Sequence, residues 1–436
     1  MLDIESNSID LNEIGHEMFR LMTKCYPICR SITGDGVRET LGLVNEVIPV
    51  ETHEVPTGTK VFDWEIPNEW NIEAAYIKDS TGKKIVDFND LNLHVLNYST
   101  PVHKKVTLNE LKKHIFTIPE QPDLIPYRTS YYQENWGFCM SHNQYVNLEE
   151  GDYEVVIQSS LKKGSLTYGE YFIPGEIEDE VLISTHICHP SLCNDNLSGI
   201  AISAFLSRWL SKQSPRFSYR FLFVPGTLGS IAWLKLNEEN VSKIKHGLVI
   251  TLLGDSSNFT YKKSRRGNAE IDQIVEHYLK HAGNDFQIND FSPYGYDERQ
   301  YCSPGFNLPV GCFTRTPHGE FPEYHTSGDN LEFVSSDNLA ASIDALANVL
   351  FVLENNFTYI NQNPKCEPML GKRGLYEKTG GRNDSKETQL AALWVLNMSD
   401  GNNSLLDIAY KSGMQFAIIK NVAAALSECD LLKQIS

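Results

Sequence analysis

Residues 181–201 read VLISTHICHPSLCNDNLSGIA, two apolar runs separated by a polar loop. The first apolar run predicts a buried strand that ends at His186, and the second apolar run, which begins at Leu197, predicts a helix. The loop between the two holds Asp195. Open α/β sheets place their ligands at the carboxyl ends of such strands. The stretch therefore predicts an α/β fold with a functional site where this strand ends.

A second polar turn, YHTSGDN at residues 324–330, supplies a further histidine, His325. Imidazole and carboxylate groups are the ligands of a hydrolytic zinc ion, which keeps one coordination position open for water. The alternative interpretation is local, because a histidine can simply end a strand and an aspartate often caps a helix. Since both turns contain such residues, we interpret His186, Asp195 and His325 as a set of metal ligands.

These segments resemble the zinc-dependent exopeptidases of the aminopeptidase Y type, in the loop from His186 to Asp195, the Asp-x-x-Ser-Gly start of the helix and the late Tyr-His-Thr turn. A narrower resemblance, to bacterial proteins with an aminopeptidase-like domain and a C-terminal winged helix, covers nearly the whole chain. Its motifs are YPICRSITGDGVRETL at 26–41, DERQ at 297–300 and EYHTS at 323–327. Members of that group are often associated with surface polysaccharide gene clusters. The resemblance implies a mostly parallel mixed sheet flanked by helices.

The resemblance also implies a role for individual residues. His186 matches the first zinc ligand, Asp195 matches the carboxylate that bridges two metal ions, and His325 matches a ligand of the second ion. Tyr324 resembles a tyrosine that stabilises the tetrahedral oxyanion. Arg315 resembles in position an arginine that binds the carboxylate of a substrate.

Three positions depart from the pattern of these exopeptidases. The strand at 221–230 contains no glutamate, and Gly226 stands where the relatives have one. Thr251 occupies the place of an aspartate ligand, and Cys188 the place of the aspartate that orients the first histidine. Three remaining ligands support one zinc ion, and a second ion would need recruited ligands. The candidate recruits are His189, Cys188, Cys193, Asp255, Asp297, Glu298, Glu320 and Glu323.

The remaining predicted site residues lie close to these segments. We predict Glu298 as the general base and Arg299 as a second substrate-binding residue beside Arg315. Arginine binds carboxylate and phosphate groups through its planar fork of N–H donors. The alternative for Arg315 is an ion pair with Glu320, which would leave it no part in substrate binding.

The domain organisation follows from changes in pattern along the chain. Short alternating runs separated by turns predict a β-rich insertion, and apolar strands that alternate with helices predict a largely parallel sheet covered on both faces. Near the end, helices around the Gly413 turn predict a winged helix. We predict an aminopeptidase-like α/β domain over 1–50 and 131–362, an inserted β-rich domain over 51–130 and a winged-helix-like domain over 366–436.

Charge restricts the partners that the chain can have. The 436 residues have a formal net charge of −18, which argues against nucleic acid or an anionic membrane surface as the main partner. Residues 366–436 contain eight Lys and Arg against eight Asp and Glu. Because phosphate contacts supply most non-specific affinity for DNA, we expect a protein-docking or dimerising role for this module, and hence a homo-oligomer.

Cysteine usage and hydropathy bear on the location of the protein. Nine cysteines form an odd number without a Cys-x-x-Cys pair, which indicates reduced thiols and no disulfide framework. We see no pattern of a signal peptide and no uninterrupted apolar run of membrane-spanning length. We therefore expect the protein in the cytoplasm, without a membrane partner.

From these observations we interpret the chain as a zinc-dependent, aminopeptidase-like hydrolase of an amide or peptide-like bond in a small substrate, linked to surface polysaccharide biosynthesis. Two alternatives remain. Gly226 and Thr251 favour a catalytically degenerate exopeptidase fold that acts as a ligand-binding or scaffold protein. The C-terminal module suggests a transcriptional regulator with a peptidase-like sensor domain, which its balanced charge opposes.

Overall fold

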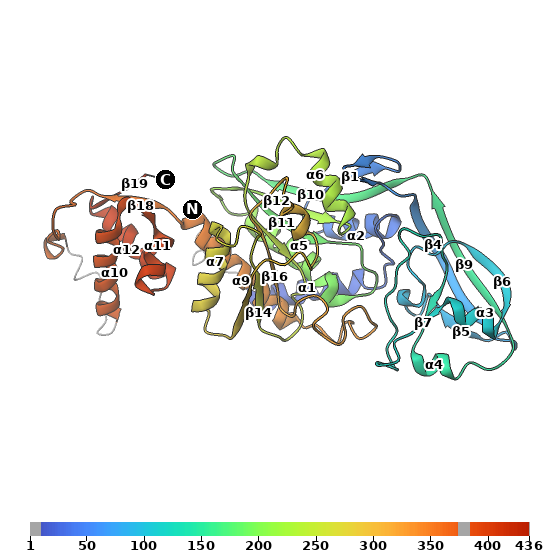
Figure 1. Ribbon diagram of the computed structural model, residues 1–436. Helices are drawn as coiled ribbons and strands as arrows, with labels where there is room; N and C mark the ends of the chain where they lie inside the picture. Colours follow the sequence, from blue (N-terminus) through green and yellow to red (C-terminus); the bar gives the residue numbers. More distant parts are fainter. Residues whose placement is uncertain (1–9, 374–383, 436) are drawn as a thin grey trace. The chain divides into compact units, whose positions relative to one another are not determined.

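A computed structural model describes residues 10–373 and 384–435, which form two compact units (Figure 1). The larger unit contains residues 10–272 and 285–346, and the smaller unit contains 273–284 and 347–435. Residues 1–9, 374–383 and 436, which fall in the predicted α/β and winged-helix segments, lie outside the described residues. Each unit is described by itself below.

The larger unit is built on an eight-stranded mixed sheet with the order β1-β10-β12-β11-β13-β16-β14-β15. The neighbouring strands β12, β11, β13 and β16 are parallel, which confirms the predicted sheet type. The strands are β1 (Glu51–Pro56), β10 (Ser165–Ile173), β11 (Glu180–His186), β12 (Ser218–Val224), β13 (Ile244–Ile250), β14 (Phe259–Lys262), β15 (Phe286–Asn289) and β16 (Val310–Thr314).

The strand order reverses direction at β11. The chain passes from β11 to β12 on one side and then returns to β13 on the other side of β11. At such a reversal the connections leave opposite faces of the sheet, and ligands bind outside the carboxyl ends of the strands. All seven residues of β11 are buried, as expected for a strand covered on both faces. The predicted site therefore lies at this reversal.

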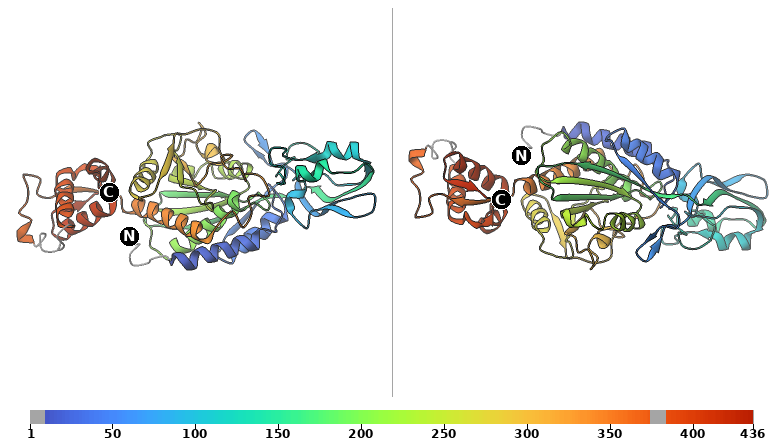
Figure 2. Two further views of the ribbon diagram at one scale, coloured as in Figure 1. Left: turned by 90° about the horizontal axis from the view of Figure 1, so that it is seen from below. Right: turned by 90° about the horizontal axis from the view of Figure 1, so that it is seen from above.

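Helices cover both faces of the sheet (Figure 2). Right-handed crossovers place α5, which joins β11 to β12, and α6, which joins β12 to β13, on opposite faces. Helices α1 and α2 pack with α5, whereas α8 packs with α6. The helices are α1 (Leu11–Cys25), α2 (Asp35–Asn45), α5 (Gly199–Leu210), α6 (Leu228–Leu236), α8 (Glu298–Tyr301) and α9 (Ser336–Asn355), with α7 (Glu270–His281) and α9 shared between the two units.

Helix α9 is, among the described residues, the one helix with the length and apolar composition of a membrane span. Its most apolar window has a mean hydropathy of 1.2, and 61% of that window is buried inside the structure. Such burial is typical of a core helix that packs against a sheet.

A second sheet of four antiparallel strands, in the order β5-β4-β9-β6, forms the β-rich insertion with an apolar core of its own. Strand β1 pairs with β10 in the large sheet, and β9 belongs to this smaller one. The predicted limits at 51 and 130 therefore do not coincide with the ends of this sheet, because side-chain alternation does not reveal a strand's partner. The strands are β4 (Glu69–Lys78), β5 (Lys84–Asp87), β6 (Val102–Thr107) and β9 (Asp152–Lys162), and short elements nearby are β2 (Lys60–Val61), β3 (Trp64–Glu65), α3 (Leu108–Leu111), β7 (Ile115–Phe116), β8 (Phe138–Cys139) and α4 (His142–Val146).

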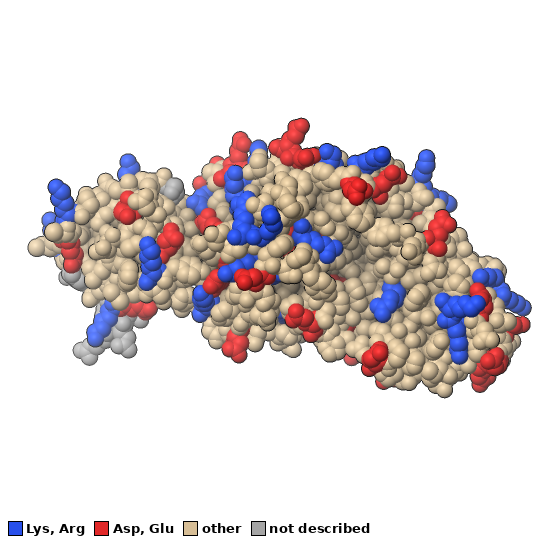
Figure 3. All heavy atoms as spheres, in the orientation of Figure 1, with Lys and Arg blue, Asp and Glu red and all other residues tan. Residues whose placement is uncertain are grey.

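The smaller unit contains the predicted winged helix, with three helices and a three-stranded sheet in the order β18-β17-β19. Gly413 ends α11 with φ 69°, as the predicted turn requires. The predicted start at 366 leaves out β17, which pairs with both other strands. On the face shown in Figure 3, acidic and basic side chains are interspersed over this unit. Its elements are β17 (Thr358–Asn361), α10 (Asp384–Met398), β18 (Asp400–Ser404), α11 (Leu405–Ser412), α12 (Phe416–Glu428) and β19 (Leu432–Gln434).

Gly34, in the motif at 26–41, offers a test of this packing. Its φ is 101°, and a Cβ atom there would lie 2.1 Å from the backbone oxygen of Trp70. We predict that Gly34→Ala lowers the free energy of unfolding by about 2 kcal/mol or more, measured by chemical denaturation. Gly42→Ala is the matched control, because Gly42 lies in α2 with no atom within 4 Å of the added Cβ, and it should stabilise by about 0.5–1 kcal/mol. Equal stabilities of the two variants would contradict the model of this turn.

Candidate metal centre

The carboxylate of Asp195 joins the two predicted histidine ligands. The Nε2 atom of His186, at the end of β11, lies 2.8 Å from Asp195 Oδ1, and the Nε2 atom of His325 lies 3.1 Å from Asp195 Oδ2. Burial opposes the ionisation of Asp195, but the imidazoles of His189, His186 and His325 hold its pKa well below the ordinary value. The structure thus brings the three predicted ligands together around a buried anionic carboxylate.

A third imidazole, that of His189, completes this cluster. One ligand atom each from His186, His189 and Asp195 lie within 4.8 Å of one another. The His189 ring centre lies 4.8 Å from that of His186 and 5.2 Å from that of His325. Burial lowers the pKa of His189 well below its ordinary value, so the ring is neutral at neutral pH. A neutral imidazole is the form that binds a metal ion.

Two atoms of the cluster lack the hydrogen bonds that buried polar atoms normally make. Within the described chain, Asp195 Oδ2 and His325 Nε2 are buried and form no hydrogen bond, although they lie 3.1 Å apart. Most buried polar atoms in proteins have a partner. Two facing unpaired atoms beside two further imidazoles therefore suit a metal ion, and a donor set of nitrogen atoms with one carboxylate suits zinc.

The loop that carries Asp195 is fixed by its backbone. The carboxylate of Asp329, four residues after His325, accepts hydrogen bonds from three successive backbone amides, at 3.1 Å from Cys193, 2.6 Å from Asn194 and 2.9 Å from Asp195. Asp329 thereby ties the turn that carries His325 to the loop that carries Asp195. This connection sets the distance between two predicted ligands that are far apart in the sequence.

The first motif of the chain fixes His189 from another direction. Arg30 is fully buried, and its Nε donates a hydrogen bond of 2.9 Å to the backbone oxygen of His189. Its Nη1 donates to the backbone oxygen of Cys25 at 2.6 Å. The motif at 26–41 therefore supports the candidate site without supplying a ligand.

Tyr296 fills the space of the missing glutamate. A Cβ atom on Gly226 would lie 1.8 Å from the Tyr296 ring, and the Tyr296 hydroxyl donates to the Gly226 backbone oxygen at 3.1 Å. The same ring lies 4.1 Å from the His186 ring, between centres. Cys188 also contacts this hydroxyl, and burial raises the pKa of its thiol to about 12. The two positions at which the resemblance implies acids are thus occupied by neutral groups.

The acids at 297 and 298 have different surroundings. Glu298, the predicted base, is fully buried, pairs with Lys262 and accepts the Tyr296 amide at 3.1 Å. Asp297 accepts a hydrogen bond of 2.7 Å from Ser230, but its Oδ2 has no hydrogen-bond partner among the described residues. Burial raises the pKa of Asp297 to about 6, an effect that the nearby His186 opposes. Asp297 therefore retains the unpaired oxygen that a proton acceptor needs.

The other predicted site residues divide into two groups. Tyr324 stacks on His325, with ring centres 4.0 Å apart, and so lies beside the cluster. The guanidinium of Arg315 instead donates hydrogen bonds to Ser342 Oγ and to the backbone oxygens of Ser257 and Asn338. These contacts hold the start of α9, and none of them reaches the cluster. Arg299 donates to the Gly295 backbone oxygen at 3.4 Å.

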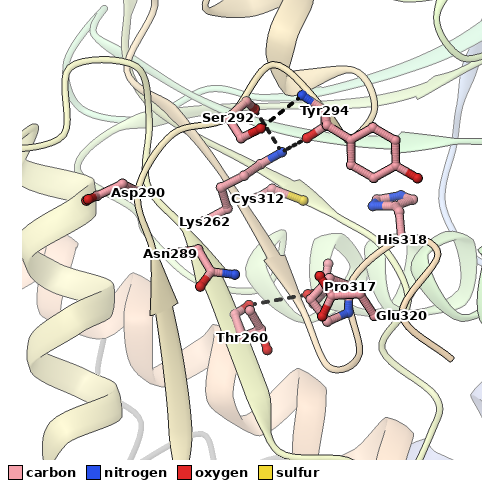
Figure 4. A pocket seen from close by; sticks show the side chains of 12 residues that line it. Thr260, Lys262, Asn289, Asp290, Ser292, Tyr294, Cys312, Pro317, His318 and Glu320 are labelled. Carbon is pink, nitrogen blue, oxygen red and sulfur yellow. Dashed lines mark hydrogen bonds between the residues drawn. The ribbon is translucent and has the colours of Figure 1, made fainter.

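A cavity of about 210 Å³ opens beside the cluster, between the edge strands of the sheet and two loops (Figure 4). His318 lines it, is buried, and stacks on Tyr296 at 5.8 Å between ring centres. Sequence reasoning missed His318, although its place shortly after β16 parallels that of His186 at the end of β11. The lining residues are Thr260, Lys262, Asn289, Asp290, Ser292, Tyr294, Gly295, Cys312, Thr314, Pro317, His318 and Glu320.

The contacts of Asp329 lead to a prediction about stability. Asp329→Asn should lower the free energy of unfolding of the metal-free protein by about 2 kcal/mol, because an amide group cannot accept all three backbone hydrogen bonds. Urea denaturation measures this change. Asp90→Asn, at an exposed position, is the control and should change stability by less than about 0.5 kcal/mol. Wild-type stability of Asp329→Asn would show that these hydrogen bonds do not fix the loop.

Comparisons with known proteins identify the family. Residues 19–356 match the family described as "Domain of unknown function (DUF4910)", and residues 357–434 match a winged helix-turn-helix family. A Clostridium acetobutylicum protein named for polysaccharide biosynthesis and an aminopeptidase-like domain is 55% identical over 424 residues, which cover 97% of this chain and 98% of that protein.

Solved structures agree with this assignment. A crystal structure from Clostridium acetobutylicum, named for a peptidase, has a TM-score of 0.95 at 53% identity and covers 99% of both chains. A zinc aminopeptidase from Bacillus subtilis has a TM-score of 0.56 at 12% identity, over 78% of this chain and 95% of that one, which shows a shared fold. The chain therefore belongs to the DUF4910 family, with an aminopeptidase-like fold followed by a winged helix-turn-helix domain.

Proposed function

We propose that this protein is a zinc-dependent hydrolase of an amide or peptide-like bond in a small substrate. The proposal rests on two buried atoms, Asp195 Oδ2 and His325 Nε2, which have no hydrogen-bond partner among the described residues and lie within a cluster of imidazoles. The cluster lies at the strand-order reversal, where α/β sheets bind ligands. His186, Asp195 and His325 would hold the ion.

The relatives support the kind of substrate and its setting. The peptidase-like fold of the solved neighbours favours an amide or peptide bond. The name of the Clostridium relative favours a step in polysaccharide biosynthesis. We infer that the substrate is a small molecule with an amide bond from that process, and that it reaches the cluster in the cytoplasm.

A zinc ion in such a site supplies Lewis acidity toward a carbonyl oxygen and lowers the pKa of water. The residues of the chain then orient the substrate and move protons. We assign the proton acceptor to Asp297 in preference to Glu298, because Lys262 and the Tyr296 amide already engage Glu298. A base works in its deprotonated form, so hydrolysis should fall as the pH drops through about 6, the pKa of Asp297.

Two neighbouring groups have roles that their positions support. The hydroxyl of Tyr324, on a ring stacked against His325, would donate a hydrogen bond to the developing oxyanion. The cavity lined by His318 would take the part of the substrate next to the scissile bond (Figure 4). Because Arg315 is held by α9, we propose no contact between this arginine and the substrate.

The proposal predicts different effects for ligands and base. Alanine at His186, Asp195 or His325 should abolish stoichiometric zinc binding, measured by elemental analysis, together with hydrolysis of a panel of aminoacyl and N-acyl amides. Asp297→Asn should keep the zinc and lose at least about 100-fold in kcat. Arg299→Ala serves as a folded control for metal content. Unchanged zinc in His325→Ala would refute the ligand assignment.

The winged helix raises the alternative of a DNA-binding regulator. The recognition-type helix α12 contains one basic residue, Lys420, whose ammonium lies over the ring of Phe351 at 5.3 Å. Its exposed positions include Ala417, Asn421 and Ala424, and none of these side chains carries a positive charge that could neutralise a DNA phosphate. We therefore propose that this unit docks a protein partner or a second copy of the chain.

This assignment predicts no measurable binding of the full-length protein to duplex DNA at physiological salt. The physical reason is that α12 carries a single basic side chain, Lys420, with which to neutralise phosphate charge. Fluorescence anisotropy with labelled random and genomic duplexes measures it. Sub-micromolar affinity that weakens as salt rises would support the regulator instead.

A further inference from the structure

We propose that His189 is a fourth ligand of the metal centre and takes over the coordination that the missing acids at Gly226 and Thr251 would provide. The inference rests on the metal site of the proposed function. It goes further by assigning a ligand that the exopeptidase pattern lacks, and it implies a site for one ion built from three imidazoles and one carboxylate.

The geometry of the cluster selects His189. Among the described residues, the group of His, Cys, Asp and Glu side chains with ligand atoms within 4.8 Å of one another consists of His186, His189 and Asp195. His189 also faces His325, at 5.2 Å between ring centres. His186 lies at Asp195 Oδ1 and His325 at Oδ2, so His189 is near both imidazoles that flank this carboxylate. With four protein ligands, the water or substrate that hydrolysis needs would bind as a fifth ligand, a coordination number to which catalytic zinc can expand.

The position of His189 is fixed by residues that do not belong to the cluster. The buried guanidinium of Arg30 holds its backbone oxygen at 2.9 Å. The ring of Tyr127 stands edge-on to His189 at 5.2 Å and to His325 at 5.1 Å, so one aromatic ring contacts both imidazoles. A ligand fixed in this way loses little conformational entropy when a metal binds.

The side of the site where the family has acids is closed. Tyr296 occupies the space that any side chain at 226 would need. Thr251, fully buried, has a short neutral side chain whose hydroxyl forms no hydrogen bond within the described residues. Two divalent ions close together repel strongly unless several carboxylates offset their charge. Asp195 is the one carboxylate of the cluster, and its single negative charge offsets only part of the charge of one zinc ion. A second zinc ion beside the first is therefore disfavoured.

His318 provides a matched control. It is a buried histidine with 7% exposure, close to the 5% of His189, and its ring centre lies 6.5 Å from that of His186. Its ring lies farther from His186 than the 4.8 Å of His189, and it lines the cavity (Figure 4). Replacing His189 or His318 removes one buried imidazole near His186, but only the change at His189 would remove a proposed ligand.

The test compares His189→Gln with His318→Gln in the full-length protein, with zinc alone as the probe. Competition against a chromophoric chelator gives the zinc dissociation constant without any substrate. We expect His189→Gln to weaken zinc binding by more than about 100-fold and His318→Gln to change it by less than about threefold. Cobalt-loaded protein should show an altered visible absorption spectrum in the first variant only.

The outcomes separate this inference from the proposed function. Wild-type zinc affinity of His189→Gln, with loss of zinc in His186→Gln, would overturn the fourth ligand and keep the metal site. Absence of zinc binding by the wild-type chain would overturn both. If His189→Gln does not fold, proton NMR of the cobalt-loaded wild-type protein provides the test, because each imidazole bound to cobalt gives a paramagnetically shifted N–H signal. Three such signals would support His189 as a ligand, and two would overturn it.

Discussion

The buried carboxylate of Asp195 is the constraint on which the rest of the site depends. A buried charge is costly unless it is paired, and this carboxylate has His186 hydrogen-bonded at Oδ1 and the imidazole of His325 3.1 Å from Oδ2, which forms no hydrogen bond within the described residues. The fold supplies that pairing from two distant segments. Strand β11 ends in His186, and the turn that carries His325 is tied by Asp329 to the loop of Asp195. The order of the strands, the hydrogen bonds of Asp329 and the burial of the site thus all determine the surroundings of Asp195.

Around this carboxylate the protein has neutral side chains where the exopeptidase pattern implies acids. The positions of the absent acids hold Tyr296 and Thr251, which are neutral, while the cluster gains the imidazole of His189. Replacing carboxylates with imidazoles lowers the negative charge available to metal ions. If the site holds zinc as proposed, its side chains therefore favour one ion over two.

The sequence predicted the local parts of this arrangement well. The apolar run before His186 and the polar loop after it predicted the buried strand. The resemblance predicted Asp195 and His325 as ligands of one metal centre, and the structure places the two side chains 3.1 Å apart. It did not reveal that β9 joins the smaller sheet and β1 the large one, since alternation shows a strand but not its partner. It also missed the packing of Tyr296 over Gly226 and the engagement of Arg315 by α9, because both depend on tertiary contacts between distant segments.

The most direct test of the metal centre is the zinc content of the wild-type protein, purified without chelator, saturated with zinc and freed of loosely bound ions. We expect about one tightly bound zinc ion per chain, lost in Asp195→Asn. Two tightly bound ions would contradict the single-ion site, and none would contradict the metal centre itself.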